Sequence, residues 1–194
     1  MEKKRNKNAI RSVNMLTDAY VSLLEELPAE RITVTAIVTR AGLNRSTFYA
    51  HFGCPEDVHK LLEQKLVDEL FENINGLDPK GLIQDPKPIL GVVSGLIEER
   101  KSFVRLMFER HPSAGWLDRI KETVIEKFVS DADSAGLFED RELFITNIRF
   151  FVGGYISMCR DYISNKFDKP MSELTETLSA TIAGGLETGI KEYK

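Results

Sequence analysis

Apolar residues recur at intervals of three and four along most of the chain, and this spacing gathers them on one face of a helix. The pattern is clearest near the start, where it runs through Ile10, Val13, Leu16, Tyr20, Leu23, Leu24 and Leu27. No segment shows the strict alternation of apolar and polar residues that marks a half-buried strand. We therefore predict an all-α fold.

Capping residues predict a pair of short helices in the first part of the chain. Thr33 can cap a helix over 34–41, and Gly42 follows where a left-handed residue closes a helix at no steric cost. Asn44 can cap the next helix, over 45–52. Two short helices joined by a tight glycine turn have helix-turn-helix geometry, in which the second helix can lie in the DNA major groove.

The rest of the chain is predicted to be a helical bundle. A fourth helix is expected from Pro55 to about residue 75, and the glycines and prolines of 76–88 predict a loop between subdomains. Further helices are expected at about 88–111, 115–134, 139–165 and 171–191. The predicted organisation is a three-helix DNA-binding domain (1–53), a connecting helix (54–75) and a C-terminal helical domain (76–194).

The net charge of −4 is unevenly distributed. Residues 1–53 hold eight basic and five acidic side chains, whereas the other 141 residues hold 18 and 25. Four of the eight basic residues lie between Lys3 and Lys7. Such an arm suits nucleic acid, because each neutralised phosphate releases counterions, but it would equally be a solvated tail. The asymmetry indicates which end of the chain would meet DNA.

Cysteine usage and hydropathy bear on the compartment. Cys54 and Cys159 are too few for a disulfide framework, which favours a reducing, cytoplasmic compartment. Cys54 precedes a helix, where a thiol pKa can be lowered, although a small capping residue is the simpler explanation. The longest apolar run, Phe150 to Cys159, is too short to span a bilayer, and the first residues lack a secretory signal. We expect neither a membrane partner nor secretion.

Metal and catalytic patterns are missing from the sequence. His51, His59 and His111 are scattered along the chain, and no pair of them is spaced from a cysteine as the ligands of a zinc site are. The sequence contains no nucleophile elbow, P-loop or dinucleotide fingerprint. We therefore expect no metal, no cofactor and no enzymatic activity.

The outward face of the helix over 45–52 is small and polar. At 100° per residue, Phe48 and Phe52 face the core, whereas Ser46 and Ala50 point the opposite way. Small outward side chains allow a helix to approach base edges closely. Arg45 begins the helix, where it can reach a guanine or a phosphate. Thr47 and Tyr49 lie on the flanks, and His51 is either a phosphate contact or a half-buried histidine.

Residues 33–52, TVTAIVTRAGLNRSTFYAHF, resemble the helix-turn-helix signature of the TetR/AcrR family of transcriptional regulators. The resemblance implies phosphate contacts from Thr33, Tyr49 and His51, and base-edge contacts from Arg45, Ser46 and Thr47. Two further residues complete the predicted DNA-binding set, namely Thr35 and Lys60. Family members often carry a lysine where this chain has Pro55, so either that phosphate contact is lost or Lys60 supplies it.

The later helices supply candidates for a homodimer interface, which the resemblance also implies. On 139–165 one face holds Phe144, Ile148, Phe151, Val152, Tyr155, Cys159 and Tyr162, and a second adds Ile145, Ile156 and Ile163. On 171–191 the repeat is Leu174, Leu178, Ile182, Leu186 and Ile190, and glycine pairs at 153–154 and 184–185 would admit a neighbouring backbone. One apolar face is expected inside the subunit and another against a second copy, unless both helices are simply core.

The resemblance further implies an effector pocket in the C-terminal domain. The aromatic and thioether residues expected to line it are Phe103, Met107, Trp116, Phe151, Tyr155 and Met158. Ordinary core packing is the alternative for such a stripe. No buried charge pattern identifies the small-molecule effector.

The sequence thus predicts a cytoplasmic, homodimeric transcriptional regulator, most simply a repressor, that binds double-stranded DNA at a palindromic operator and responds to an effector. A second hypothesis is a protein-interaction adaptor that keeps the fold and acts through a protein partner. Intact Arg45, Ser46 and Thr47 favour DNA binding, and Pro55 favours the adaptor.

Overall fold

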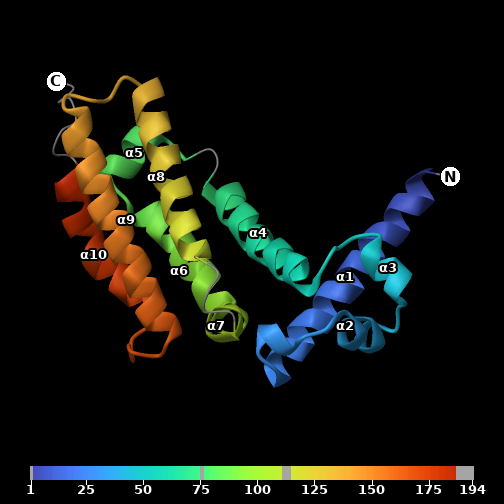
Figure 1. Cartoon of the computed structure of the whole chain (residues 1–194). Helices are drawn as coiled ribbons and strands as arrows, with labels where there is room; N and C mark the ends of the chain where they lie inside the picture. Colours follow the sequence, from blue (N-terminus) through green and yellow to red (C-terminus); the bar gives the residue numbers. More distant parts are fainter. Residues whose placement is uncertain (1, 75–76, 111–114, 187–194) are drawn as a thin grey trace. The chain divides into compact units, whose positions relative to one another are not determined.

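The computed structural model describes residues 2–74, 77–110 and 115–186, and in these it is all-α, without a strand, as predicted (Figure 1). Side chains of residues 2–6, 79, 108, 110 and 116 lie outside the described set. The helices in this part of the chain are α1 (Glu2–Glu26), the 3-10 turn η1 (Ala29–Arg31), α2 (Val34–Ala41), α3 (Arg45–Tyr49), α4 (Pro55–Ile74), α5 (Pro79–Gln84), α6 (Lys87–Glu99), α7 (Lys101–Arg110), α8 (Trp116–Ser134), α9 (Arg141–Ile163) and α10 (Met171–Leu186).

The chain divides into two compact units. The first comprises Met1–Asp68 and Leu106–Ser113, and the second comprises Glu69–Arg105 and Ala114–Lys194. Helices α4 and α7 therefore each contribute residues to both units.

The first unit buries one apolar side of each of its helices. Its fully buried side chains include Leu16, Tyr20 and Leu24 of α1, Ile37 of α2, Phe48 of α3, Val58 of α4 and Met107 of α7. An ion pair ties α2 to α1, because Arg40 Nη2 lies 3.0 Å from both carboxylate oxygens of Glu26. A second nitrogen, Arg40 Nη1, donates to Ser22 Oγ at 2.6 Å.

A buried polar group joins α1 to α4 inside the same unit. Tyr20 Oη lies 3.2 Å from His59 Nδ1, and His59 Nε2 lies 3.4 Å from Glu63 Oε1. All three side chains are buried. Burial raises the pKa of the Tyr20 hydroxyl above its ordinary value, with the carboxylate of Glu30 adding to the effect. His59 is thus a structural residue at the joint between two helices.

Several helix bounds differ from the predicted ones. The α1 helix begins at Glu2, so the basic segment from Lys3 is helical rather than an arm. The predicted loop over 76–88 contains α5, because Asp78 caps it by accepting the Gly81 N–H at 2.8 Å and Pro79 fits the first turn. The predicted helix over 88–111 breaks at Arg100, whose backbone leaves helical geometry between α6 and α7.

The second unit packs α5, α6, α8, α9 and α10 around a separate apolar core. Tyr155 of α9 is buried in it, and its hydroxyl donates to the Leu90 carbonyl at 3.1 Å and lies 3.0 Å from Thr175 Oγ1. Where α9 meets α10, the Gly185 carbonyl accepts from Asn147 Nδ2 at 2.9 Å. A Cβ on Gly185 would lie 2.1 Å from Phe151 Cζ, so any side chain there would have to displace the Phe151 ring.

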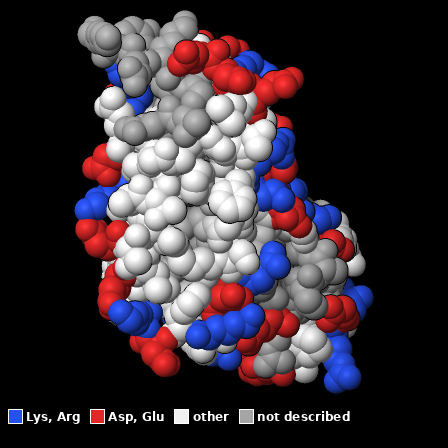
Figure 2. Space-filling model, turned by 90° about the vertical axis from the view of Figure 1, so that its left-hand side faces the viewer, with Lys and Arg blue, Asp and Glu red and all other residues white. Residues whose placement is uncertain are grey.

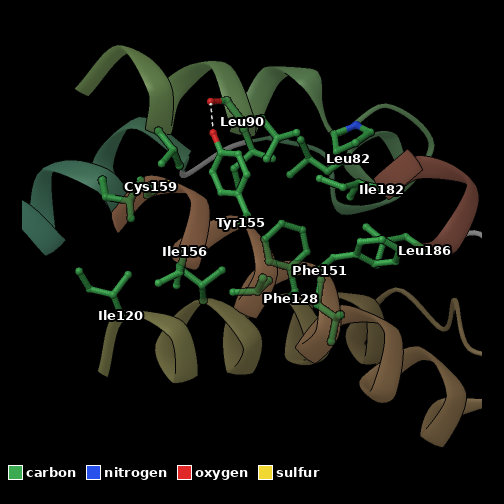
Figure 3. A pocket seen from close by; sticks show the side chains of 17 residues that line it. Leu82, Leu90, Ile120, Phe128, Phe151, Tyr155, Ile156, Cys159, Ile182 and Leu186 are labelled. Carbon is green, nitrogen blue, oxygen red and sulfur yellow. Dashed lines mark hydrogen bonds between the residues drawn. The ribbon is translucent and has the colours of Figure 1, made fainter. Parts of the chain in front are cut away.

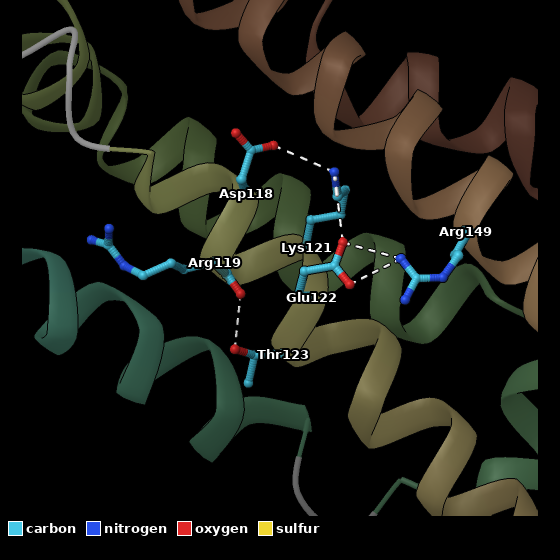
Figure 4. A network of polar contacts seen from close by, with 6 residues as sticks. All are labelled: Asp118, Arg119, Lys121, Glu122, Thr123 and Arg149. Carbon is cyan, nitrogen blue, oxygen red and sulfur yellow. Dashed lines mark hydrogen bonds and ion pairs between the residues drawn. The ribbon is translucent and has the colours of Figure 1, made fainter.

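A polar network on the surface links α8 to α9 (Figure 4). Arg149 Nη1 lies 3.1 and 2.9 Å from the two carboxylate oxygens of Glu122, and Lys121 bridges Glu122 and Asp118 at 3.8 and 3.4 Å. Exposed ion pairs of this kind each contribute little to stability.

The apolar residues predicted to form the dimer interface lie mostly inside the second unit. Ile163 is buried and Ile156 lines an inner cavity, so the second predicted face of α9 also points inward. On α10, Ile182 and Leu186 are buried in the core, with Leu174 and Leu178 packed against it, and Ile190 lies outside the described residues. The core therefore uses most of these residues, which is the alternative that the sequence leaves open for both helices.

Candidate nucleic-acid interface and inner cavity

Helices α2 and α3 form the helix-turn-helix that the caps predict. Thr33 Oγ1 accepts the Ala36 N–H at 3.2 Å and begins α2. Gly42 follows α2 with φ +65°, and the Leu43 N–H bonds back to the Val38 carbonyl at 2.9 Å. Asn44 then begins α3 as its N-cap. The bounds of α2 agree with the prediction, whereas α3 ends at Tyr49, three residues early, because the His51 N–H bonds to the Phe48 carbonyl in a tighter turn.

The α3 helix turns its aromatic residues to opposite sides. Phe48 and Phe52 are buried, with ring centroids 5.6 Å apart, and they anchor the helix in the first unit. Tyr49 is 58% exposed and touches Phe48 only edge-on. Ser46 and Ala50 are exposed beside it, and His51 is half-buried with its ring against Phe52. An anchored helix with a small, polar outer surface results.

Side chains on this surface are held by short hydrogen bonds. Arg45 Nη2 donates to Thr35 Oγ1 at 2.6 Å, which joins the start of α3 to α2. Asn44 Oδ1 accepts from the Thr47 N–H at 2.8 Å, Ser46 Oγ at 2.7 Å and Thr47 Oγ1 at 2.9 Å. The sequence identifies Asn44 only as a cap; its hold on two hydroxyls depends on side-chain rotamers that spacing does not reveal.

Asp57 fixes the turn between α3 and α4. Its Oδ2 accepts the Gly53 N–H at 2.9 Å and the Cys54 N–H at 3.1 Å. These bonds, the Gly53 one foremost, hold the pKa of the Asp57 carboxyl below its ordinary value. Lys60, one of the predicted DNA contacts, lies 3.6 Å from Glu56 on the exposed side of α4.

The predicted DNA-binding residues therefore come together on one unit. Thr33 caps α2, and the others lie on α2, α3, α4 or the turns between these helices: Thr35, Arg45, Ser46, Thr47, Tyr49, His51 and Lys60. Four basic residues of the same unit are also exposed, namely Lys7, Arg11, Arg31 and Arg40, and Arg40 is paired with Glu26. The contacts of the predicted residues with DNA stay a prediction.

The second unit contains a partly open apolar cavity of about 100 Å³, lined by residues of α4, α5, α6, α8, α9 and α10 (Figure 3). No charged residue is among those that line it within the described chain. The Tyr155 hydroxyl is occupied by its bond to the Leu90 carbonyl. Burial raises the pKa of the Cys159 thiol to about 12, so this lining residue stays neutral. The lining residues are Leu70, Leu82, Pro86, Ile89, Leu90, Val93, Ile120, Val124, Phe128, Ile148, Phe151, Val152, Tyr155, Ile156, Cys159, Ile182 and Leu186.

Two of the six predicted pocket residues, Phe151 and Tyr155, line this cavity. Phe103 is half-buried, Met158 packs against the core and Met107 is buried in the first unit; none of the three is among the lining residues. The Trp116 side chain lies outside the described residues. Sequence reasoning missed the α8 contribution, although Ile120, Val124 and Phe128 recur every four residues.

Across the described residues, no cluster of three or more His, Cys, Asp or Glu side chains is arranged to hold a metal ion. No helix in the same residues combines the length and apolar character needed to cross a membrane.

Comparison with known proteins places the fold. No family model matches the chain. The nucleoid occlusion factor SlmA of Marinomonas sp. (strain MWYL1) is 26% identical over 125 residues, which are 63% of this chain and 62% of that protein. The dihydroxyacetone kinase operon activator DhaS matches with a TM-score of 0.67 at 15% identity, covering 93% of this chain and 98% of DhaS. The TetR family repressor AlkX from Dietzia sp. strain DQ12-45-1b matches with a TM-score of 0.56 at 19% identity, covering 94% and 99%.

An all-α chain with a helix-turn-helix near its start and a helical bundle after it belongs to the class of all-α helix-turn-helix folds. The particular fold is that of the TetR family of transcriptional regulators, which confirms the resemblance seen in residues 33–52.

Proposed function

We propose that the protein is a DNA-binding transcriptional regulator that acts as a homodimer on a palindromic operator. The observation that carries the proposal is the outer surface of α3. The helix is anchored through Phe48 and Phe52, and it exposes Ser46, Ala50 and Tyr49. Its first residue, Arg45, is hydrogen-bonded to Thr35 on α2. A small, polar, rigid surface on a helix-turn-helix is what major-groove readout requires.

Roles follow from where each side chain lies. Arg45 and Ser46 read base edges together with Thr47, while Tyr49 and His51 at the end of α3 contact phosphates. Thr33 and Thr35 at the start of α2 contact phosphates as well, because helix N-termini and hydroxyls are common phosphate ligands.

Support for a homodimer comes from an uncharged strip on α9 and α10. On α9, Phe150 is 74% exposed, and Leu143, two turns earlier on the same face of the helix, is also exposed. Further exposed, uncharged residues continue the strip: Thr146, Gly154, Ser157, Thr177, Ala180, Thr181 and Gly184. Figure 2, which views this side, shows a broad uncharged face bordered by charged residues. Two copies joined there would present two α3 helices to the two halves of a palindrome.

The cavity is proposed as the effector site, and its lining selects the chemistry. With no charge and its tyrosine hydroxyl occupied, it favours a neutral, apolar molecule. Its volume of about 100 Å³ is below the roughly 300–1,000 Å³ of drug-sized sites, which indicates a small ring or a short alkyl chain. Helix α4 would couple effector binding to DNA binding, because it carries both Leu70 of the cavity lining and Asp57, which holds the turn after α3.

Repression is the simplest mode of regulation, since a dimer that covers an operator blocks the access of other proteins to that DNA. The same fold occurs in activators and in repressors, because DhaS is named as an activator and AlkX as a repressor.

Footprinting on the DNA upstream of the protein's own coding sequence tests the proposal. We expect protection of a palindrome, with Arg45→Ala and Tyr49→Ala each weakening it severely. Only non-specific binding by the wild-type protein at physiological salt would favour the protein-interaction adaptor instead.

A further inference from the structure

Two hydroxyls at the start of α2 keep their hydrogens available. Thr33 Oγ1 accepts the Ala36 N–H, and Thr35 Oγ1 accepts from Arg45 Nη2. A hydroxyl donates one hydrogen and accepts through its lone pairs. Both threonines thus have an engaged lone pair and a hydrogen to offer to an acceptor such as a phosphate oxygen.

Two hydroxyls of α3 have their hydrogens already bonded to Asn44. Ser46 Oγ and Thr47 Oγ1 both donate to Asn44 Oδ1, at 2.7 and 2.9 Å. The Thr47 N–H donates to the same atom at 2.8 Å, which identifies that atom as the carboxamide oxygen, because the amide nitrogen cannot accept. With their hydrogens committed, Ser46 and Thr47 offer only lone pairs to a ligand.

Whether a hydroxyl can donate or only accept matters in the major groove, where bases present both donors and acceptors. The exocyclic amino groups of adenine and cytosine donate, whereas purine N7, guanine O6 and thymine O4 accept. We propose that Asn44 is a specificity-determining residue that holds Ser46 and Thr47 as acceptors and directs them to exocyclic amino groups. The inference rests on the proposed DNA-binding function and adds the chemical group that α3 reads.

The experiment begins by locating the base pairs that each hydroxyl reads. Selection from randomised duplexes with the wild-type protein, Ser46→Ala and Thr47→Ala identifies the pairs whose preference each variant loses. At those pairs, purine replaces adenine or pyrimidin-2-one replaces cytosine, which deletes the amino group. A 7-deazapurine at the same pair deletes the N7 acceptor and is the matched control.

We expect deletion of the amino group to weaken wild-type binding about five- to tenfold, the effect of one hydrogen bond, and deletion of N7 to leave it unchanged. In Ser46→Ala or Thr47→Ala, the amino deletion at the corresponding pair should cause no further loss. These two variants leave the Asn44 cap of the Thr47 N–H in place.

Asn44 itself is tested by two substitutions that both keep a capping side chain. Asn44→Asp retains an oxygen that accepts from both hydroxyls, so the amino preference should persist even though the added charge weakens binding overall. Asn44→Ser has too short a side chain to hold both hydroxyls, so the amino preference should disappear. Melting temperatures near that of the wild type show that each variant is folded.

An operator on which N7 deletion weakens wild-type binding and amino deletion does not would overturn this inference alone. Retention of the amino preference by Asn44→Ser would do the same. If the wild-type protein enriches no sequence, the proposed DNA-binding function fails, and the inference fails with it.

Discussion

Single residues at the candidate interface act mainly by holding backbone or side chains in place. The sequence predicts the caps at Thr33 and Asn44, because a cap depends on neighbours three positions away. It does not predict the bond between Arg45 and Thr35, whose residues lie ten positions apart on different helices. Contacts of that kind depend on how two helices cross, which the local pattern does not encode.

Asp57 gives a pH-dependent prediction at this scale. Its folded-state pKa is lowered by the Gly53 and Cys54 N–H groups, so its contribution is present above the ordinary aspartate pKa and is lost as the pH falls through the lowered one. We expect wild type to be more stable than Asp57→Asn at about pH 7, and the difference to shrink towards about pH 3. Urea unfolding of both proteins across this range measures it; a difference independent of pH would contradict the assignment.

Elements with strong local signals agree with their predicted bounds, and those shaped by packing do not. The α2 helix has both a cap and a glycine stop, and its ends agree with the prediction. The α3 helix ends early because a tighter turn and the Asp57 carboxylate shape the segment that follows. The α5 helix is not predicted from the sequence, because the glycines and prolines of 76–88 indicate a loop and outweigh the Asp78 cap.

The turn between α2 and α3 depends on Gly42, whose φ is +65°. A Cβ there would meet no atom within 4 Å, so only backbone strain opposes a side chain. We expect Gly42→Ala to lower the free energy of unfolding by about 1–2 kcal/mol, and Gly42→Asn by less, since asparagine visits this region more readily. Thermal unfolding followed by circular dichroism compares them, and an alanine variant as stable as wild type would disprove the strain.

Gly185 lies where α9 and α10 cross, next to a ring that lines the cavity. A Cβ at Gly185 would displace the Phe151 ring, which lines the cavity. We expect toluene to raise the melting temperature of the wild type and benzoate, which is charged, to have no effect. The toluene shift should shrink in Gly185→Ala.

Gly91→Ala is the matched control for this variant, because Gly91 is exposed on α6 and a Cβ there would meet no atom within 4 Å. The control should keep the full toluene shift. Equal shifts in both variants, or a benzoate shift as large as that of toluene, would contradict the proposed ligand chemistry.

On the scale of the whole molecule, the charge asymmetry concerns the end that would bind DNA, and the uncharged strip on α9 and α10 concerns the dimer. The sequence predicts the basic first part and a dimer, and most of the residues that it offers for the dimer interface are used by the core instead. Periodicity finds the apolar sides of α9 and α10, and the core takes those sides. What remains exposed is a strip of small residues around Phe150, which carries little apolar periodicity.

Phe150 therefore tests the dimer. We expect the wild type to elute with about twice the 22.0 kDa mass of one chain, and Phe150→Glu to shift towards the monomer, because a buried charge without a partner opposes association. Ser130→Glu, on an exposed position of α8, is the control and should leave the mass unchanged. Light scattering after size exclusion measures all three; a monomeric wild type at micromolar concentration would exclude the interface.

The central claim is sequence-specific DNA binding through α3, and equilibrium anisotropy titration measures it most directly. The wild-type protein is titrated at physiological salt with its selected palindrome and with a scrambled duplex of the same composition. We predict at least about a 10³-fold preference for the palindrome, falling sharply in Arg45→Ala. Equal affinity for the two duplexes would contradict the account.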